Sequence, residues 1–282
     1  GVSYAGALRS VSGSNTVSGL VTLGSASRIN SDLDLLTLSG NVSGTGVGVS
    51  FGGVGDTTVS GVIGLGSGTL TKDGSGVLTL SGANTYSGAT TVSGGLLSAG
   101  SGSLANTVSI AVNGGTLNAV DYNSAASLAV DSTGTATVSG VGLSLGNVSN
   151  ANGSVNAVNF SGTTGTITIG SLSGVGNTRF GSNATLSGGM SNGTVNVVGL
   201  LSGDIYGGVV FANALNAGVV SGGLSSITTV GTIGTMSGGS MALGGLATVG
   251  TMSGGTLKLN GVGTSTIGTL NGGSLNLGSG VV

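Results

Sequence analysis

The sequence contains no cysteine, histidine, proline, tryptophan or glutamate, and most of these absences exclude a class of chemistry. Without histidine, neither a Ser-His-Asp triad nor a histidine-ligated zinc site can be assembled. Without cysteine there are no disulfides, which is compatible with secretion but identifies no compartment. Without glutamate, the hydrolysis of sugars would depend on pairs of aspartates. The sequence therefore predicts a protein that is not an enzyme and that uses no cofactor or metal.

Charged and aromatic residues are also scarce, at 4% and 3% of the 282 residues. Five lysines and arginines form no basic patch, so nucleic-acid binding lacks its electrostatic driving force. No apolar run approaches the ~20 residues that cross a bilayer, so we expect no direct membrane insertion by this segment. Four tyrosines and four phenylalanines are too few for a thick globular core. A solenoid has a thin interior that small aliphatic side chains can fill.

What the sequence does have is 63 glycines and a repeated text. A Ser/Asn-Gly-Gly triplet followed by alternating apolar residues begins at Ser221, Ser237, Ser253 and Asn271, at spacings of 16, 16 and 18 residues. This period suits one turn of a β-solenoid, in which short strands meet at glycine-rich corners. One such turn cannot bury its apolar row without its neighbours. We therefore expect an all-β, single-stranded parallel β-helix.

The alternation within each repeat predicts which side chains face inward. Leu257 and Leu259 flank Lys258, and side chains two residues apart on a strand share a face. Stacking the repeats in register predicts two interior columns, Met241–Leu257–Leu275 and Leu243–Leu259–Leu277. Glycine pairs are expected at the corners, where a positive φ costs glycine little. The glycines that we assign to such corners are Gly94, Gly95, Gly114, Gly115, Gly238, Gly239, Gly254, Gly255, Gly272 and Gly273.

Upstream of these repeats the turns are longer and less regular. Short β-branched segments between glycine, serine and asparagine predict strands there. The segments are Leu33–Leu38, Val77–Leu80, Thr90–Val92, Thr107–Val112, Thr135–Val138, Thr166–Ile169 and Thr194–Val198. Neither a linker nor a shift in composition divides the chain. We therefore expect one continuous β-solenoid over residues 1–282, with the short regular turns at 221–282.

One stretch carries a long motif: Leu70-Thr-Lys-Asp-Gly-Ser-Gly, then Leu78-Thr-Leu-Ser-Gly-Ala-Asn-Thr-Tyr-Ser-Gly, then Thr90-Thr-Val and Gly94-Gly95-Leu96. This text closely resembles the autotransporter-associated β-strand repeat, also called the passenger-associated transport repeat. The resemblance extends over about residues 7–119. It implies a right-handed parallel β-helix in a passenger exported to the bacterial outer cell surface. It also implies that the repeat assists export and folding.

Four places have the residue types for chemistry, and for each we favour a structural interpretation. Asp32 and Asp34 on a strand would share a face at ~6.8 Å, a separation that suits an inverting glycosidase, but the resemblance places Asp32 in a turn. Gly52-Gly-Val-Gly-Asp56 is similar to a calcium-binding nonapeptide. Its aspartate comes one residue early and no tandem copy exists, which favours a corner. We expect Lys72-Asp73 to be a solvated charge pair and Tyr86 to be a packing or corner residue.

Three functions are compatible with these features. The leading one is a non-catalytic structural or adhesive surface protein, a rod-like passenger or stalk. The second is a filament subunit stacked head to tail, because neither Gly1-Val-Ser-Tyr-Ala-Gly nor the segment 277–282 carries a charged cap. The third, a carbohydrate-active β-helix, is disfavoured by the lack of stacking rings and clustered carboxylates. The expected partners are copies of the chain or further β-helical segments end to end, and surface receptors or glycans.

Overall fold

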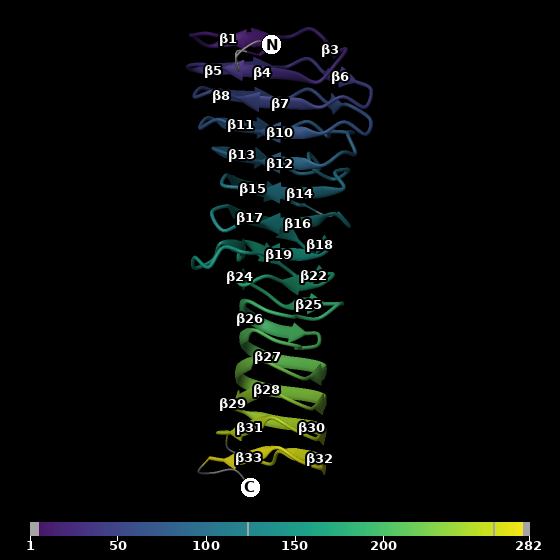
Figure 1. The fold of residues 1–282 in the computed structure, drawn as a ribbon, viewed down its shortest axis with the longest axis vertical. Helices are drawn as coiled ribbons and strands as arrows, with labels where there is room; N and C mark the ends of the chain where they lie inside the picture. The colour runs from purple at the N-terminus through teal and green to yellow at the C-terminus, as the bar shows by residue number, and fades with distance from the viewer. Residues whose placement is uncertain (1–5, 123, 262, 279–282) are drawn as a thin grey trace. The chain divides into compact units, whose positions relative to one another are not determined.

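The computed structural model describes residues 6–122, 124–261 and 263–278. Within these ranges the regular structure consists of strands, with no helix. Each strand pairs in parallel with the strands one turn earlier and one turn later (Figure 1). The fold is an all-β parallel β-solenoid, as the sequence predicts. The right-handed sense implied by the family resemblance stays a prediction.

The chain forms two compact units. Unit 1 comprises Gly1–Gly140 and Ser144–Gly146, and unit 2 comprises Val141–Leu143 and Asn147–Val282. Each unit is a stack of solenoid turns with its own apolar interior. One continuous solenoid over residues 1–282 stays a prediction.

Unit 1 contains three stacks of parallel strands. The first is, in hydrogen-bonded order, β1 (Leu8–Ser10), β4 (Ser27–Ser31), β7 (Val49–Gly52), β10 (Leu70–Lys72), β12 (Thr90–Val92), β14 (Ser109–Val112) and β16 (Ser127–Val130). The second is β2 (Asn15–Val17), β5 (Leu35–Leu38), β8 (Asp56–Val59), β11 (Val77–Leu80), β13 (Leu96–Ala99), β15 (Thr116–Val120) and β17 (Thr135–Val141). The third is β3 (Val21–Leu23), β6 (Val42–Gly44) and β9 (Ile63–Gly64), and the last strand of the unit is β18 (Ser144–Leu145).

The turns of unit 1 are long and vary in length. Ser27 pairs with Val49, 22 residues later, whereas Ser109 pairs with Ser127, 18 residues later. The registers nonetheless align side chains into interior columns. One fully buried column is Leu38, Val59, Leu80, Ala99, Ala119 and Val138.

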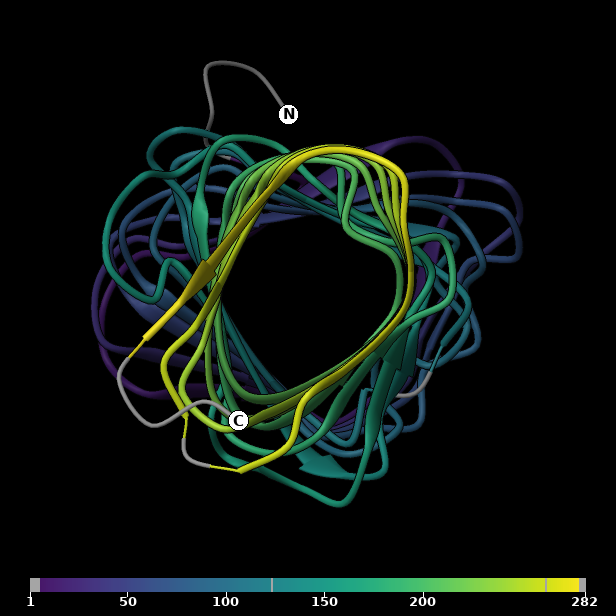
Figure 2. The ribbon, with the colours of Figure 1, turned by 90° about the horizontal axis from the view of Figure 1, so that it is seen from below.

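Unit 2 changes from short to long strands along its sequence. Its first strands are β19 (Val148–Asn150), β20 (Val158–Phe160), β21 (Thr163–Thr164), β22 (Ile167–Ile169), β23 (Leu172–Ser173), β24 (Asn177–Phe180) and β25 (Ala184–Leu186). The later ones are β26 (Thr194–Ser202), β27 (Val209–Val220), β28 (Leu224–Met236), β29 (Ser240–Leu243), β30 (Leu246–Met252), β31 (Thr256–Leu259), β32 (Thr266–Leu270) and β33 (Ser274–Leu277). Seen along the stack, the green and yellow turns of this unit follow closely similar outlines (Figure 2).

The predicted columns of the repeated text are present in unit 2. Met241 pairs with Leu257 and Leu257 with Leu275, and the second column, Leu243–Leu259–Leu277, has the same register. Leu257 and Leu259 are buried, whereas Leu277 is 61% exposed. The second column extends upstream through Ile227, Ala212, Val197, Phe180 and Phe160, where two stacked rings lie 5.1 Å apart.

The glycine pairs have two separate steric requirements. In the repeated text, the second glycine of each pair has a positive φ: 75° at Gly239, 80° at Gly255 and 92° at Gly273. A Cβ on the first glycine would overlap the backbone carbonyl of the serine one turn earlier. These contacts are Gly238 with Ser221, Gly254 with Ser237 and Gly272 with Ser253. Of the other predicted corner glycines, Gly95 and Gly114 also have positive φ, and a Cβ on Gly94 or Gly115 would crowd the preceding turn.

Most predicted strands are present, with some shifts at their ends. The segments Val77–Leu80 and Thr90–Val92 coincide with β11 and β12. The segment Leu33–Leu38 was placed too early, because Asp34 has φ 61° and extended structure begins only at Leu35. Of the others, β14 and β22 begin later than predicted, and β17 and β26 end later.

Candidate functional site

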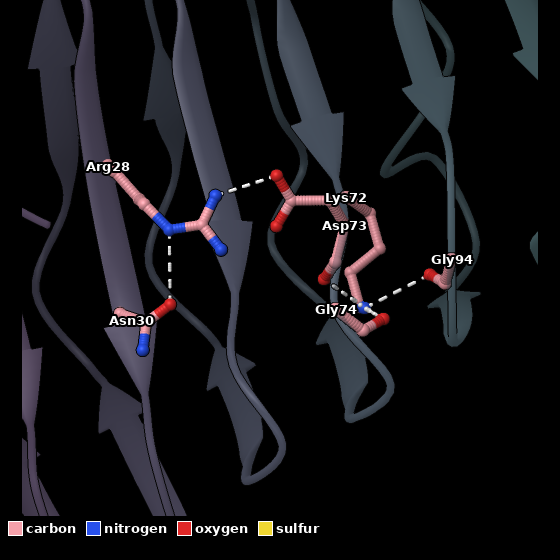
Figure 3. A network of polar contacts seen from close by, with 6 residues as sticks. All are labelled: Arg28, Asn30, Lys72, Asp73, Gly74 and Gly94. Atoms are coloured by element: carbon pink, nitrogen blue, oxygen red, sulfur yellow. Dashed lines mark hydrogen bonds and ion pairs between the residues drawn. The ribbon is translucent and has the colours of Figure 1, made fainter. Parts of the chain in front are cut away.

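Lys72 occupies an interior position of unit 1. The register places it between Phe51 on β7 and Val92 on β12, in an otherwise apolar column. The residue is 2% exposed. Its Nζ donates hydrogen bonds to the backbone carbonyls of Asp73 (2.7 Å), Gly74 (2.9 Å) and Gly94 (3.1 Å) (Figure 3). All three donors of the ammonium are therefore satisfied at this corner.

This geometry corrects the expectation that Lys72 is a solvated turn residue. Its aliphatic stem fills a column position, and its charged end reaches the corner where φ of 71° at Gly74 turns the chain. Burial lowers the pKa of Lys72, and the negative charge of Asp73 partly offsets this effect. The backbone carbonyls offer the ammonium acceptors in place of water.

Asp73, unlike Lys72, faces outward and forms an ion pair across two turns. Its Oδ2 lies 2.6 Å from Nη1 of Arg28, which belongs to β4, so the pair spans the intervening strand β7 (Figure 3). Nε of Arg28 also donates to Oδ1 of Asn30 at 3.1 Å. Gly52 ends β7 between the partners, and a Cβ at this position would overlap both the guanidinium and the carboxylate.

Three further polar residues of the motif are buried in unit 1: Asn84, Tyr86 and Thr90. Oδ1 of Asn84 accepts the N–H of Ile63 at 2.8 Å, and its Nδ2 donates to the carbonyl of Ser103 at 3.0 Å. Asn84 thus connects the preceding and the following turn. The hydroxyls of Tyr86 and Thr90 lie 2.7 Å apart. Burial raises the pKa of Tyr86 to about 12.

Residues 70–99 match the passenger-associated-transport-repeat family. The matched segment contains β10 to β13 together with Lys72, Asn84, Tyr86 and Thr90. The resemblance seen in the sequence is therefore confirmed for this segment, which is a transport repeat within a parallel β-solenoid. Comparison of the chain with curated proteins and with solved structures found no match. In the part of the chain that the structure describes, no helix has the length and apolar character of a membrane span.

Tyr86 of the transport repeat is 1% exposed, which agrees with the predicted packing role and leaves no ring face for a sugar. Thr107, which follows the repeat, extends the buried network. Its Oγ1 lies 3.1 Å from Oγ1 of Thr90 and donates to the carbonyl of Gly88 at 2.7 Å. The polar residues that make the repeat recognisable therefore hold neighbouring turns together.

Asp32 and Asp34 lie in the bend between β4 and β5, not on a strand, so the strand geometry considered for a sugar hydrolase is not realised. Oδ2 of Asp32 accepts from Nε of Arg9 at 2.7 Å. The hydrogen bond from Arg9 is the largest of the effects that lower the pKa of Asp32, which is the wrong direction for a general acid. Oδ2 of Asp34 accepts the N–H of Gly13 at 2.9 Å.

The glycine-rich stretch before Asp56 forms the corner between β7 and β8, as the favoured interpretation predicts. Oδ1 of Asp56 accepts the N–H of Val77 in the next turn at 2.8 Å. Among residues 6–122, 124–261 and 263–278, no group of three or more acidic residues is placed to hold a metal ion. The carboxylate has instead a structural partner.

Sequence reasoning missed a recurring device, in which a corner side chain accepts a backbone N–H of a neighbouring turn. Asn41 accepts from Val62 at 2.9 Å in unit 1. Within unit 2, the same contact is made by three acceptor–donor pairs, Asn147–Ser171, Asn183–Leu200 and Asp204–Val219. The available signal was the presence of single Asn or Asp residues among the glycines and serines of the corners.

Proposed function

We propose that the chain is a non-catalytic segment of an exported bacterial passenger, with a structural or adhesive role at the outer cell surface. One observation carries this proposal: the characteristic polar residues of the transport repeat point into the solenoid. Lys72, Asn84 and Tyr86 are each at most 2% exposed. Side chains placed in this way stabilise a stack of turns and present nothing to a substrate.

The partners of the aspartates support the absence of catalysis. Asp73 is paired with Arg28, and Asp56 accepts a backbone N–H. One oxygen of Asp131 accepts the N–H groups of Thr133 and Gly134, and these hydrogen bonds contribute to lowering its pKa. A hydrolase that uses two carboxyl groups needs one that is protonated at working pH and one free to act on water or substrate.

The transport repeat would assist export by fixing the register of a folding solenoid. Parallel pairing of turns about 20 residues apart requires a loop to close before any contact forms. Lys72 contacts Gly94, which lies 22 residues later, and Asn84 contacts Ser103, which lies 19 residues later. These directional contacts select one register among several that the apolar residues alone would permit. A correctly registered turn can then pair with the next one as it emerges.

Display of the chain through a bacterial autotransporter system would test this role. We expect Lys72→Met and Asn84→Leu to lower the amount of chain that protease reaches on intact cells, with synthesis unchanged. Thr71→Val is the matched control, because Thr71 lies on the same strand and faces outward. Full surface display of both repeat variants would overturn the role in export. Turnover of a glycan by the purified chain that disappears in Asp32→Ala would overturn the absence of catalysis.

End-to-end association with copies of the chain or with further β-helical segments stays a prediction. The terminal residues 1–5 and 279–282, on which the filament argument depended, lie outside the described residues. Sedimentation of the purified chain over a range of concentrations would test it. Assembly that grows with concentration would favour a filament subunit, and a stable monomer would favour a passenger segment alone.

A further inference from the structure

Unit 2 has two cationic residues in its sequence, Arg179 and Lys258, and both lie in one outward-facing column. The pairing registers define this column, which we name the cationic column: Asn159, Arg179, Asn196, Phe211, Ser226, Ala242, Lys258 and Asn276. Arg179 and Lys258 stand five turns apart in it. With strands ~4.8 Å apart, that separation is about 24 Å.

Two adjoining hollows follow the cationic column. One, of about 330 Å³, is lined by Arg179, Asn196 and Phe211 among others. The next, of about 310 Å³, is lined by Phe211, Ser226 and Lys258 among others. Phe211 contributes to both and is 47% exposed. A shallow groove therefore runs along the column, with an aromatic ring between two cations.

The two cations have no anionic partner in the described part of unit 2, where the two ion pairs of the described chain do not lie. Nε of Arg179 is buried and lacks a hydrogen-bond partner. The single acidic residue of the unit, Asp204, accepts the N–H of Val219 and the hydroxyl of Tyr206. The groove therefore carries uncompensated positive charge, which an anionic ligand would neutralise.

We propose that the cationic column binds a linear anionic polysaccharide that lies along it. The face of Phe211 can receive a sugar ring, while Arg179 and Lys258 attract sulfate or carboxylate groups on either side. The amides of Asn196 and Asn276 and the hydroxyl of Ser226 suit sugar hydroxyls. This inference rests on the proposed surface function and gives it a ligand chemistry.

A repeating polymer fits the column better than an extended peptide. A peptide that adds to a sheet requires an unpaired strand edge. The strands that line the groove are already paired on both sides, as β27 is with β26 and β28, and β29 is with β28 and β31. Recognition must therefore use side chains alone. These are spaced at the regular interval of the turns, which suits a ligand built from identical units.

Binding of dextran sulfate, dextran and poly-glutamate to the purified chain tests the proposal. We expect saturable binding of dextran sulfate that weakens as salt is raised, and much weaker binding of the other two polymers. Arg179→Gln or Lys258→Gln should each weaken binding about fivefold, the change that corresponds to an exposed ion pair. Phe211→Ser should weaken it about tenfold through loss of ring stacking.

Tyr206→Ser is the matched control for the aromatic variant, because Tyr206 is 49% exposed and lies outside the column. Circular dichroism would verify that all variants are folded. Equal binding of poly-glutamate and dextran sulfate, or unchanged binding by the three column variants, would overturn the proposal. A chain that reaches the cell surface and binds no dextran sulfate would refute this inference and leave the proposed function intact.

Discussion

The transport repeat in unit 1 and the repeated text in unit 2 form the same fold with different chemistry. The repeat places Lys72, Asn84 and Tyr86 inside and satisfies each with hydrogen bonds. The repeated text places aliphatic side chains such as Leu257 inside and Lys258 outside. One region is held by directional polar contacts and the other by stacked apolar columns.

This difference teaches how register is specified in each region. An apolar column of similar leucines and methionines accepts a neighbour one repeat away almost as well as the correct one. A buried amide or ammonium without its partners is costly, so it excludes wrong pairings. The polar repeat therefore contributes specificity, while the apolar repeat contributes most of its stability through burial.

The apolar columns should be the most sensitive to charge. Leu257→Asp should destabilise unit 2 by about 4 kcal/mol, because the carboxylate would lie between Met241 and Leu275 without a partner. Lys258→Asp, on the outward face of the same strand, is the control and should cost under about 1 kcal/mol. Urea unfolding followed by hydrogen exchange would measure both. Residues 250–277 unprotected in the unmodified protein would contradict the buried ladder.

The polar contacts of unit 1 should resist replacement by an apolar side chain of similar size. Lys72→Met keeps the stem in its column but leaves three carbonyls without their donor, at a cost of about 2 kcal/mol. Met241→Leu in unit 2 is the comparison and should cost less, because that site contains no polar partner. Denaturant midpoints of the two variants would be compared. A Lys72→Met protein as stable as the original would remove the distinction between the regions.

Alkaline pH should separate the two units. Burial raises the pKa of Tyr86 and of Tyr122 to about 12 in folded unit 1. The unfolded chain releases these protons near pH 10, so their contribution is complete below pH 10 and is lost as pH rises through 12. At pH 12 the loss from Tyr86 is about 2 kcal/mol. The lowered pKa of Lys72 acts oppositely, since its penalty disappears as pH rises towards the ordinary lysine value.

Thiol reporters would measure this effect, since the chain has no cysteine of its own. Val92→Cys reports on unit 1 and Val249→Cys on unit 2, both at buried positions. Labelling after a pH jump should reach the unit 1 reporter first. Adding Tyr86→Phe should move its transition to higher pH. Simultaneous labelling of the two reporters would show that the buried tyrosines do not set the alkaline limit.

The smallest expected effect concerns Gly52, which separates Arg28 from Asp73. Gly52→Ala should displace the ion pair and cost about 1 kcal/mol. Gly24→Ala is the control, because nothing lies within 4 Å of the position its Cβ would occupy. In an Arg28→Gln background, Gly52→Ala should cost much less, since the pair is already absent. Equal costs in both backgrounds would place the effect in the backbone.

The sequence predicted the fold class and the apolar columns because both follow from a period of two within a strand and a repeat between turns. It predicted Lys72 wrongly because its charge was weighed above its place in the alternation with Leu70. The partners of Lys72 include Gly94 in the next turn, and Arg28 lies 45 residues before Asp73. Such contacts depend on how corners of different lengths stack, which the pattern along the chain does not contain.

The stacked glycine pairs of unit 2 have a consequence for how such a chain can change its length. Each 16-residue block has its own corner, its own inward leucines or methionines and the same offset to the next block. A tandem duplication of one block would therefore meet familiar surfaces above and below, with no compensating substitution. Removal of a block would rejoin equivalent neighbours. The number of turns can thus vary by recombination between copies, while every individual contact is preserved.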